Sequence, residues 1–102
     1  MGIGYNSDFS DVNNTAYLSG TVTVGTSAIE AKVGGSALDE RQTVRIYNSS
    51  NAVIYFGPAG VTISTGEPLE KKQWVSIPAG KSNPVYLIRA SSSGSVIVQE
   101  MS

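Results

Sequence analysis

The sequence contains no cysteine and no histidine. Without cysteine the chain has no disulfide framework, no thiol nucleophile and no thiolate ligand for a metal. Without histidine it lacks the commonest general acid or base near neutral pH, which is also the commonest metal ligand. Together these absences exclude most catalytic mechanisms. We therefore predict that the protein is not an enzyme and that it uses neither a cofactor nor a metal.

Charge is also scarce. Only 15% of the 102 residues are charged, and 7 Lys and Arg against 8 Asp and Glu give a formal net charge of −1. Such a balance, without a block of like charge, creates no field that would attract nucleic acid or anionic lipid. No stretch approaches the roughly 18 apolar residues of a membrane span, and the first residues do not resemble a secretory signal. We expect no nucleic-acid partner, no membrane partner and synthesis in a cytoplasm.

The first 20 residues differ in composition from the rest. Gly, Asn, Asp and Ser dominate, and the apolar residues are scattered among them. A polar tract of this kind cannot by itself bury enough apolar surface to offset the entropy of ordering it. The composition predicts an extended N-terminal arm over residues 1–20, either mobile or ordered by lying on a neighbour, and a β-sandwich domain over residues 21–102.

From residue 21 onward apolar and polar residues alternate with a period of two, which is typical of strands with one buried face. Clusters of Gly, Pro, Asn and Ser separate these segments at intervals of about 8 to 12 residues. The pattern predicts an all-β fold, a small antiparallel β-sandwich or jelly-roll-like barrel of about eight short strands. The expected strands are residues 21–24, 28–33, 41–47, 52–56, 61–64, 73–77, 85–89 and 95–99.

The aromatic residues allow two interpretations. Tyr47, Tyr55, Phe56, Trp74 and Tyr86 fall in or beside expected strands. They would serve either as a stacking platform for a sugar or a single-stranded nucleic acid, or as core and cross-strand packing, which is the commoner use. The segment 52–56 is apolar on both faces, which indicates burial from both sides or one face kept for a partner.

Several segments resemble, in order, those of small structural proteins of tailed bacteriophages. The segments are residues 22–28, 41–50, 53–57, 61–69 and 85–88. The resemblance covers about residues 21–99 and implies a capsid decoration (cement) protein or another accessory virion subunit. It would be a non-enzymatic virion protein made in the host cytoplasm. Its partners would be the major capsid protein or other virion subunits, and further copies of itself in a trimer or dimer.

We expect many weak contacts, repeated around a symmetric shell, to provide the avidity of such a protein. The residues expected to contact other subunits are apolar residues of the arm and of the two-sided strand, namely Tyr5, Phe9, Tyr17, Leu18, Val53, Tyr55 and Phe56. An alternative function is a tail, head-fibre or adhesion module that binds a host-surface glycan through Tyr and Trp side chains.

Overall fold

The computed structural model describes residues 16–102, and within them it has eight strands and no helix. No helix of this part of the chain is long and apolar enough to span a membrane. The strands are β2 (Tyr17–Val24), β3 (Ile29–Glu30), β4 (Thr43–Tyr47), β5 (Ile54–Gly57), β6 (Glu67–Leu69), β7 (Trp74–Ile77), β8 (Tyr86–Ile88) and β9 (Gly94–Met101). All their pairings are antiparallel, so the predicted all-β class is confirmed.

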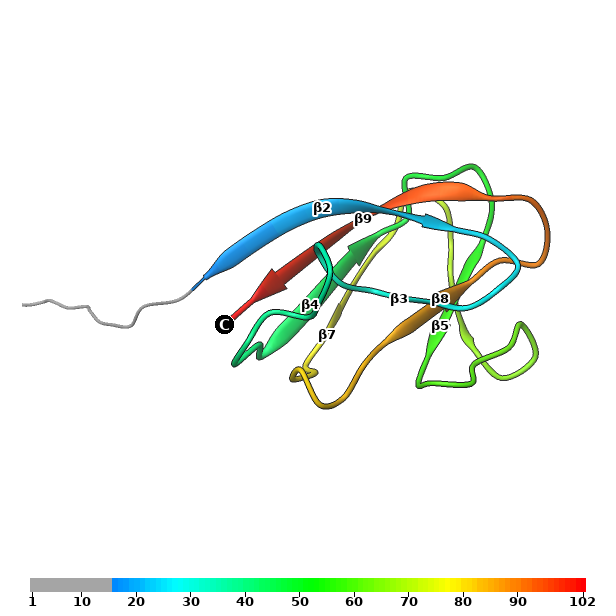
Figure 1. Cartoon of the computed structure of the whole chain (residues 1–102). Coiled ribbons are helices and arrows are strands. Elements are labelled where there is room, and N and C mark those ends of the chain that lie inside the picture. Colours follow the sequence, from blue (N-terminus) through cyan, green and yellow to red (C-terminus); the bar gives the residue numbers. More distant parts are fainter. Residues whose placement is uncertain (1–15) are drawn as a thin grey trace, which may run out of the picture.

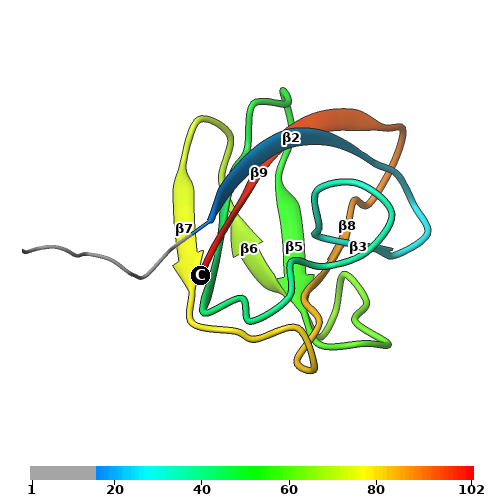
Figure 2. The same cartoon turned by 60° about the vertical axis from the view of Figure 1, so that its left-hand side comes forward.

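The strands form two four-stranded sheets, in the orders β2-β9-β4-β7 and β3-β8-β5-β6 (Figures 1 and 2). The pairings are nested along the chain: β5 pairs with β6, β4 with β7, β3 with β8, and β2 with β9. One long hairpin is thus rolled up so that successive pairs fall alternately in the two sheets. This nesting is the topology of a double-sheet jelly roll.

The core lies between the two sheets, and every second residue of the strands points into it. Along β9, Val96 and Val98 are fully buried while the residues between them are partly exposed, because successive side chains point to opposite faces. Ile46 of β4 and Ile54 and Leu87 of the other sheet complete the centre and are likewise fully buried. Each such side chain contributes about 1.5–3 kcal/mol by leaving water.

Several expected boundaries differ in the structure. Of the strand expected at residues 28–33, only Ile29–Glu30 forms a strand, β3. Residues 61–64 were predicted to be a strand but form a turn, in which the backbone N–H groups of Thr65 and Gly66 donate to the carbonyl of Thr62. The strand follows instead as β6, whose Pro68 is tolerated because β6 is at the edge of its sheet. At the other end of the chain, residues 17–20 belong to β2, although their composition had placed them in the arm.

The loop between β5 and β6 explains why β5 is apolar on both faces. Ile54 and Phe56 point toward the core, and Val61 of the loop is 5% exposed. A Cβ atom built on Gly57 or on Gly66 would lie less than 3.0 Å from Cγ2 of Val61, so both glycines are needed for this close packing. The loop thus covers part of the outer side of β5, where Tyr55 and Gly57 are half-buried.

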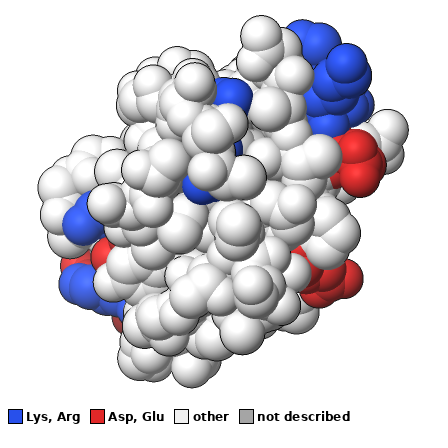
Figure 3. Space-filling view, turned by 90° about the vertical axis from the view of Figure 1, so that its right-hand side faces the viewer, with Lys and Arg blue, Asp and Glu red and all other residues white. Residues whose placement is uncertain are grey.

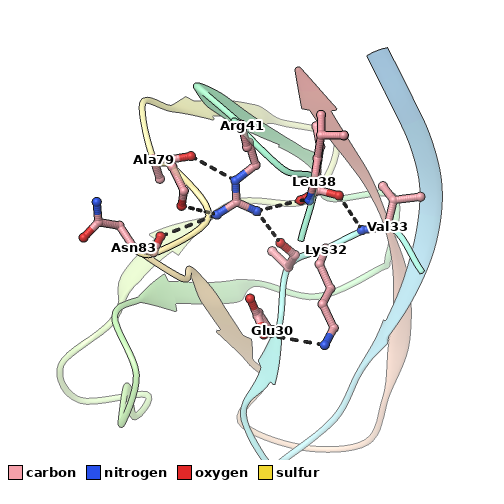
Figure 4. Close-up of polar contacts among 10 residues, drawn as sticks. Glu30, Lys32, Val33, Leu38, Arg41, Ala79 and Asn83 are labelled. Carbon is pink, nitrogen blue, oxygen red and sulfur yellow. Dashed lines mark hydrogen bonds and ion pairs between the residues drawn. The ribbon is translucent and has the colours of Figure 1, made fainter. Parts of the chain in front are cut away.

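A buried ion pair holds together the loops at one end of the sandwich. Nη1 of Arg41 lies 2.7 Å from Oε2 of Glu100, and both side chains are fully buried. Glu100 also accepts hydrogen bonds from the backbone N–H groups of Val33 and Leu38, and Arg41 donates to the carbonyl of Ala79 (Figure 4). The pair thereby fastens the β3–β4 and β7–β8 connections to the end of β9.

Asn48 likewise fastens separate segments to one another, at the turn after β4. Its side chain is fully buried, and its Nδ2 donates to the carbonyls of Ala52 and Leu69, at 2.9 Å each. Its Oδ1 accepts from the N–H and the hydroxyl of Ser50. The Asn-Ser turn seen in the sequence is therefore an internal polar junction that joins the start of β5 to the end of β6.

Candidate protein-interaction surface

The sheet β2-β9-β4-β7 has an open outer face. The other sheet packs against its inner side, and no further sheet or helix of residues 16–102 lies over the outer one. The residues that point outward are those that alternate with the buried ones. We call this set the outer face; it comprises Tyr17, Ser19, Thr21, Thr23, Thr43, Arg45, Tyr47, Trp74, Ser76, Ser95, Ile97, Gln99 and Met101.

The outer face carries little charge, since Arg45 is the one Lys, Arg, Asp or Glu residue in this set. The other members are hydroxyl, amide, aromatic and aliphatic side chains. Figure 3 views the molecule from the right-hand side of Figure 1. Charge is sparse there as well, since the Lys, Arg, Asp and Glu atoms form a few separate groups on an otherwise uncharged surface. The low charge of the sequence therefore leaves at least one whole sheet face almost neutral.

Tyr47 and Trp74 form an aromatic pair on the outer face. They are directly opposite each other on β4 and β7, with ring centroids 4.6 Å apart and an interplanar angle of 38°. The guanidinium carbon of Arg45 lies 4.1 Å from the centroid of the Trp74 ring. Such a cation–π contact is worth about 0.5–1 kcal/mol at an exposed site. Trp74 nevertheless remains 45% exposed, so it is available to a partner.

The apolar side chains of β9 extend this pair across the sheet. Ile97 is opposite Tyr47 on one side and Thr21 on the other, which gives a row that crosses all four strands. Tyr17, 64% exposed, is opposite Met101 at the end of the face near the C-terminus. The outer face thus has one apolar row across its width and a second apolar pair at one end.

The predicted contact residues are only partly brought together. Tyr5 and Phe9 lie outside the described residues. Tyr17 and Leu18 are both exposed at the start of β2, Tyr17 on the outer face and Leu18 on the opposite side of the strand. The remaining predicted contacts, Val53, Tyr55 and Phe56, are half-buried in or beside β5, an inner strand of the other sheet, and do not adjoin the outer face.

The aromatic residues considered as a stacking platform do not form one row. Tyr47 and Trp74 are on one sheet, while Tyr55, Phe56 and Tyr86 belong to the other. Phe56 packs against the core and also lines a hollow of about 430 Å³ with Ile77, Pro78, Pro84 and Val85 among its walls.

Ile97 and Met101 were missed as outer-face residues. The sequence did contain a signal for them, because Val96, Ile97 and Val98 make β9 apolar on both of its faces. In β9 one of these faces lies in the core, with Val96 and Val98, and Ile97 lies on the outer face.

Residues 16–102 contain no group of three or more His, Cys, Asp or Glu side chains that could hold a metal ion. Asp39, in the exposed β3–β4 connection, is 2.5 Å from Nζ of Lys81. The hydrogen bond from Lys81 and its positive charge hold the pKa of the Asp39 carboxyl below its usual value.

Comparison of the chain with protein-family models, with curated proteins and with solved structures gives no match in any of the three. The function is therefore inferred from the residues of this chain and from their arrangement.

Proposed function

We propose that the protein is a non-enzymatic structural subunit of a tailed-bacteriophage virion, a capsid decoration (cement) protein that binds and stabilises the assembled head shell. Its partners are the major capsid protein or other virion subunits, and further copies of itself. It is made in the host cytoplasm and acts on the virion. The observation that carries the proposal is the open and nearly uncharged outer face.

The composition of the outer face is that of a protein interface. The buried centres of such interfaces are depleted in Lys, Glu and Asp and enriched in aromatic residues, Met and Arg. The outer face offers Tyr17, Tyr47, Trp74, Met101 and Arg45, surrounded by Ser and Thr. Trp, Tyr and Arg are also the residue types that most often contribute the largest share of binding energy.

A face of this kind suits a repeating partner. One small neutral contact gives weak binding, but a shell offers the same contact at every symmetry-related position. Copies that are linked to one another then bind with an avidity well above that of a single contact. This accounts for how a chain of low charge would hold to a shell without electrostatic attraction.

The fold supports the same class of function by analogy. Double-sheet jelly rolls build viral capsid domains, and they also build lectins. A fold does not determine a function, so this analogy does not distinguish a shell-binding subunit from a glycan-binding one. The distinction depends on what the outer face binds.

The test is to add the purified protein to undecorated heads. We expect saturable binding at a fixed stoichiometry and a rise in the temperature at which the shells come apart. Trp74→Ala should weaken binding by about tenfold or more, as truncation of a central interface residue does. Ile63→Ala is the matched control, because Ile63 is equally exposed at 45% but lies in the β5–β6 loop. Absence of both saturable binding and heat protection would reject the proposal.

A second candidate function is a tail, head-fibre or adhesion module that binds a host-surface glycan. The exposed ring of Trp74 beside Tyr47 favours it, since sugars stack on such rings. Arg45 already covers part of one face of that ring. Glycan-array binding that is lost in Trp74→Ala, together with no binding to heads, would favour this function over shell binding.

A further inference from the structure

β2 is at the edge of its sheet, and one side of its backbone has no partner within residues 16–102. It pairs with β9 on one side only, and no backbone hydrogen bond joins its other side to any part of residues 16–102. Ser102 donates its N–H to the carbonyl of Ala16, its opposite residue. Because hydrogen-bonded and non-hydrogen-bonded pairs alternate in an antiparallel ladder, the N–H and C=O groups of Tyr17, Ser19, Thr21 and Thr23 point outward.

The other sheet edges are protected in ways that β2 is not. β3 has two residues, and β6 has three, among them Glu67 and Pro68. β7 has four residues and is followed by Pro78. β2 has eight residues, without charge or proline. Short length, charge and proline are the devices by which proteins keep edges from pairing, so β2 is built as an edge that can pair.

A hollow lies beside this edge, and an apolar side chain projects near it. Val22 and Ile29 are among the residues that line the hollow, which has a volume of about 340 Å³. Ile29 is 39% exposed. Leu18 is on the same side of β2 as Val22 and is 37% exposed. The rest of the lining is Thr21, Thr23, Glu30, Lys32 and Gly34. One copy of the chain thus has both an unfilled hollow with two apolar residues in its wall and, four residues from Val22 on the same edge, an exposed apolar side chain.

We propose that two copies of the chain pair through β2, antiparallel, around a twofold axis at Gly20. In this register all four outward-facing residues find partners: Tyr17 is opposite Thr23 of the second copy, and Ser19 is opposite Thr21. About eight backbone hydrogen bonds form, because each such pair exchanges two. The two sheets β2-β9-β4-β7 become one continuous sheet of both copies.

The same register matches the side chains to the hollow. Leu18 of one copy is opposite Val22 of the other in a non-hydrogen-bonded pair, where Cα atoms are about 4.5 Å apart and side chains are close. Opposite residues lie on the same face of a sheet, so each Leu18 enters the hollow of the other copy between Val22 and Ile29. Gly20 meets Gly20 at the axis, and on the core side Val33 of each copy packs against its own Gly20.

The inference rests on the proposed function in one respect, because a paired molecule presents two outer faces to a shell and thereby gains avidity. It names the partner on the β2 edge as a second copy of this chain. Trp74 lies on β7, at the opposite edge of the sheet, and takes no part in the pairing. Dimerisation and shell binding can therefore be lost separately.

The experiment is sedimentation velocity of the whole chain over a wide range of concentration. We expect a reversible dimer. Thr21→Pro removes an outward N–H from each copy and leaves the bonds to β9 intact, and it should raise the dissociation constant about tenfold. Thr21→Val keeps the N–H and should leave the constant unchanged. A wild-type chain that is monomeric at all concentrations would overturn the inference.

A second variant keeps the test independent of the folding of Thr21→Pro. Leu18→Lys replaces a partly exposed side chain with a charged one at the hollow, and it should prevent the dimer. Ile63→Lys, at an exposed position far from β2 in the sequence, should not. If neither Thr21→Pro nor Leu18→Lys changes the dissociation constant, the copies associate elsewhere and the proposal is wrong.

The register is tested by spin labels, since the chain has no cysteine of its own. Two labels on Tyr17→Cys, one in each copy, should be as far apart as two labels on Thr23→Cys. Each separation corresponds to six residues along the strand, or about 20 Å. Unequal separations would place the axis away from Gly20 and contradict the proposed register.

Discussion

Replacement of Glu100 by Gln should destabilise the protein strongly, although the shape of the side chain is almost unchanged. The carboxylate is fully buried and accepts hydrogen bonds from three donors: Arg41 at 2.7 Å, the N–H of Val33 at 2.9 Å and the N–H of Leu38 at 3.1 Å. An amide has a single acceptor oxygen. In either orientation its NH₂ group faces at least one of these donors, and the guanidinium loses its counter-charge.

The expected loss follows from the burial of the pair. Removal of one partner from a buried ion pair costs about 3–5 kcal/mol, because the other charge stays buried and unpaired. A domain of this size has a total stability of about 5–15 kcal/mol, so the loss is a large part of it. At about 4–8 °C for each kcal/mol, the midpoint of thermal unfolding should fall by more than 10 °C.

Urea unfolding of the wild type and the variant measures this loss, with Glu70→Gln as the control. Glu70 is exposed and forms no ion pair within residues 16–102, so its replacement should stay within about 0.5 kcal/mol. The combination of Arg41→Met with Glu100→Leu should cost less than the sum of the single changes, since no buried charge remains. A loss of less than about 1 kcal/mol for Glu100→Gln would refute the reasoning, because that is the behaviour of an exposed pair.

Two further predictions concern the loops. In Gly66→Ala the new Cβ would lie 2.9 Å from Cγ2 of Val61, so thermal unfolding should show a loss of about 1–3 kcal/mol, whereas Gly35→Ala, with open space around it, should be nearly neutral. The pKa of Asp39 is lowered by Lys81, so its small, salt-sensitive contribution to stability is present at neutral pH and is lost as the pH falls below about 4; Asp39→Asn should abolish this part of the acid dependence, and an unchanged acid dependence would contradict it.

The alternation of apolar residues was sufficient to predict the fold class and most of the strands. It was insufficient at residues 61–69, where Val61 and Ile63 alternate with Thr62 and Ser64 as in a strand. In the structure Val61 covers the outer side of β5, and the Thr62 and Thr65 side chains close the turn. That outcome depends on how the loop folds back onto the preceding strand, and the alternation of residues contains no information about it.

The buried ion pair illustrates a different limit. Glu100 continues the alternation of Val96 and Val98, so its position on the core side of β9 follows from the sequence. The expected strand ended at residue 99, and Glu100 was therefore not considered. Its partner Arg41 lies far away in the sequence, and nothing in either segment indicates the other. A charged residue on the buried side of a strand predicts that a partner exists, and only the fold identifies it.

The outer face was predicted less well than the fold. Tyr17 and Leu18 were predicted as contact residues because they are apolar residues in a polar segment, and only Tyr17 of the two lies on the outer face. Trp74 and Tyr47 were considered either as stacking residues for a sugar or nucleic acid or as packing residues, and their direct opposition on β7 and β4 was not predicted, since it depends on the register of two strands that a long segment separates. Surface sites of this kind are made by strand order, and strand order is the property that the alternation of residues does not determine.

The nested pairing has a consequence for synthesis. β2 is among the first strands to leave the ribosome, but its partner β9 is the last of the eight strands in the chain. Its free edge therefore takes shape only after β9 has been made and inserted between β2 and β4. Closure of so long a loop is slow. A growing chain thus has no finished β2 edge, and a chain that stops before β9 lacks an inner strand of this sheet.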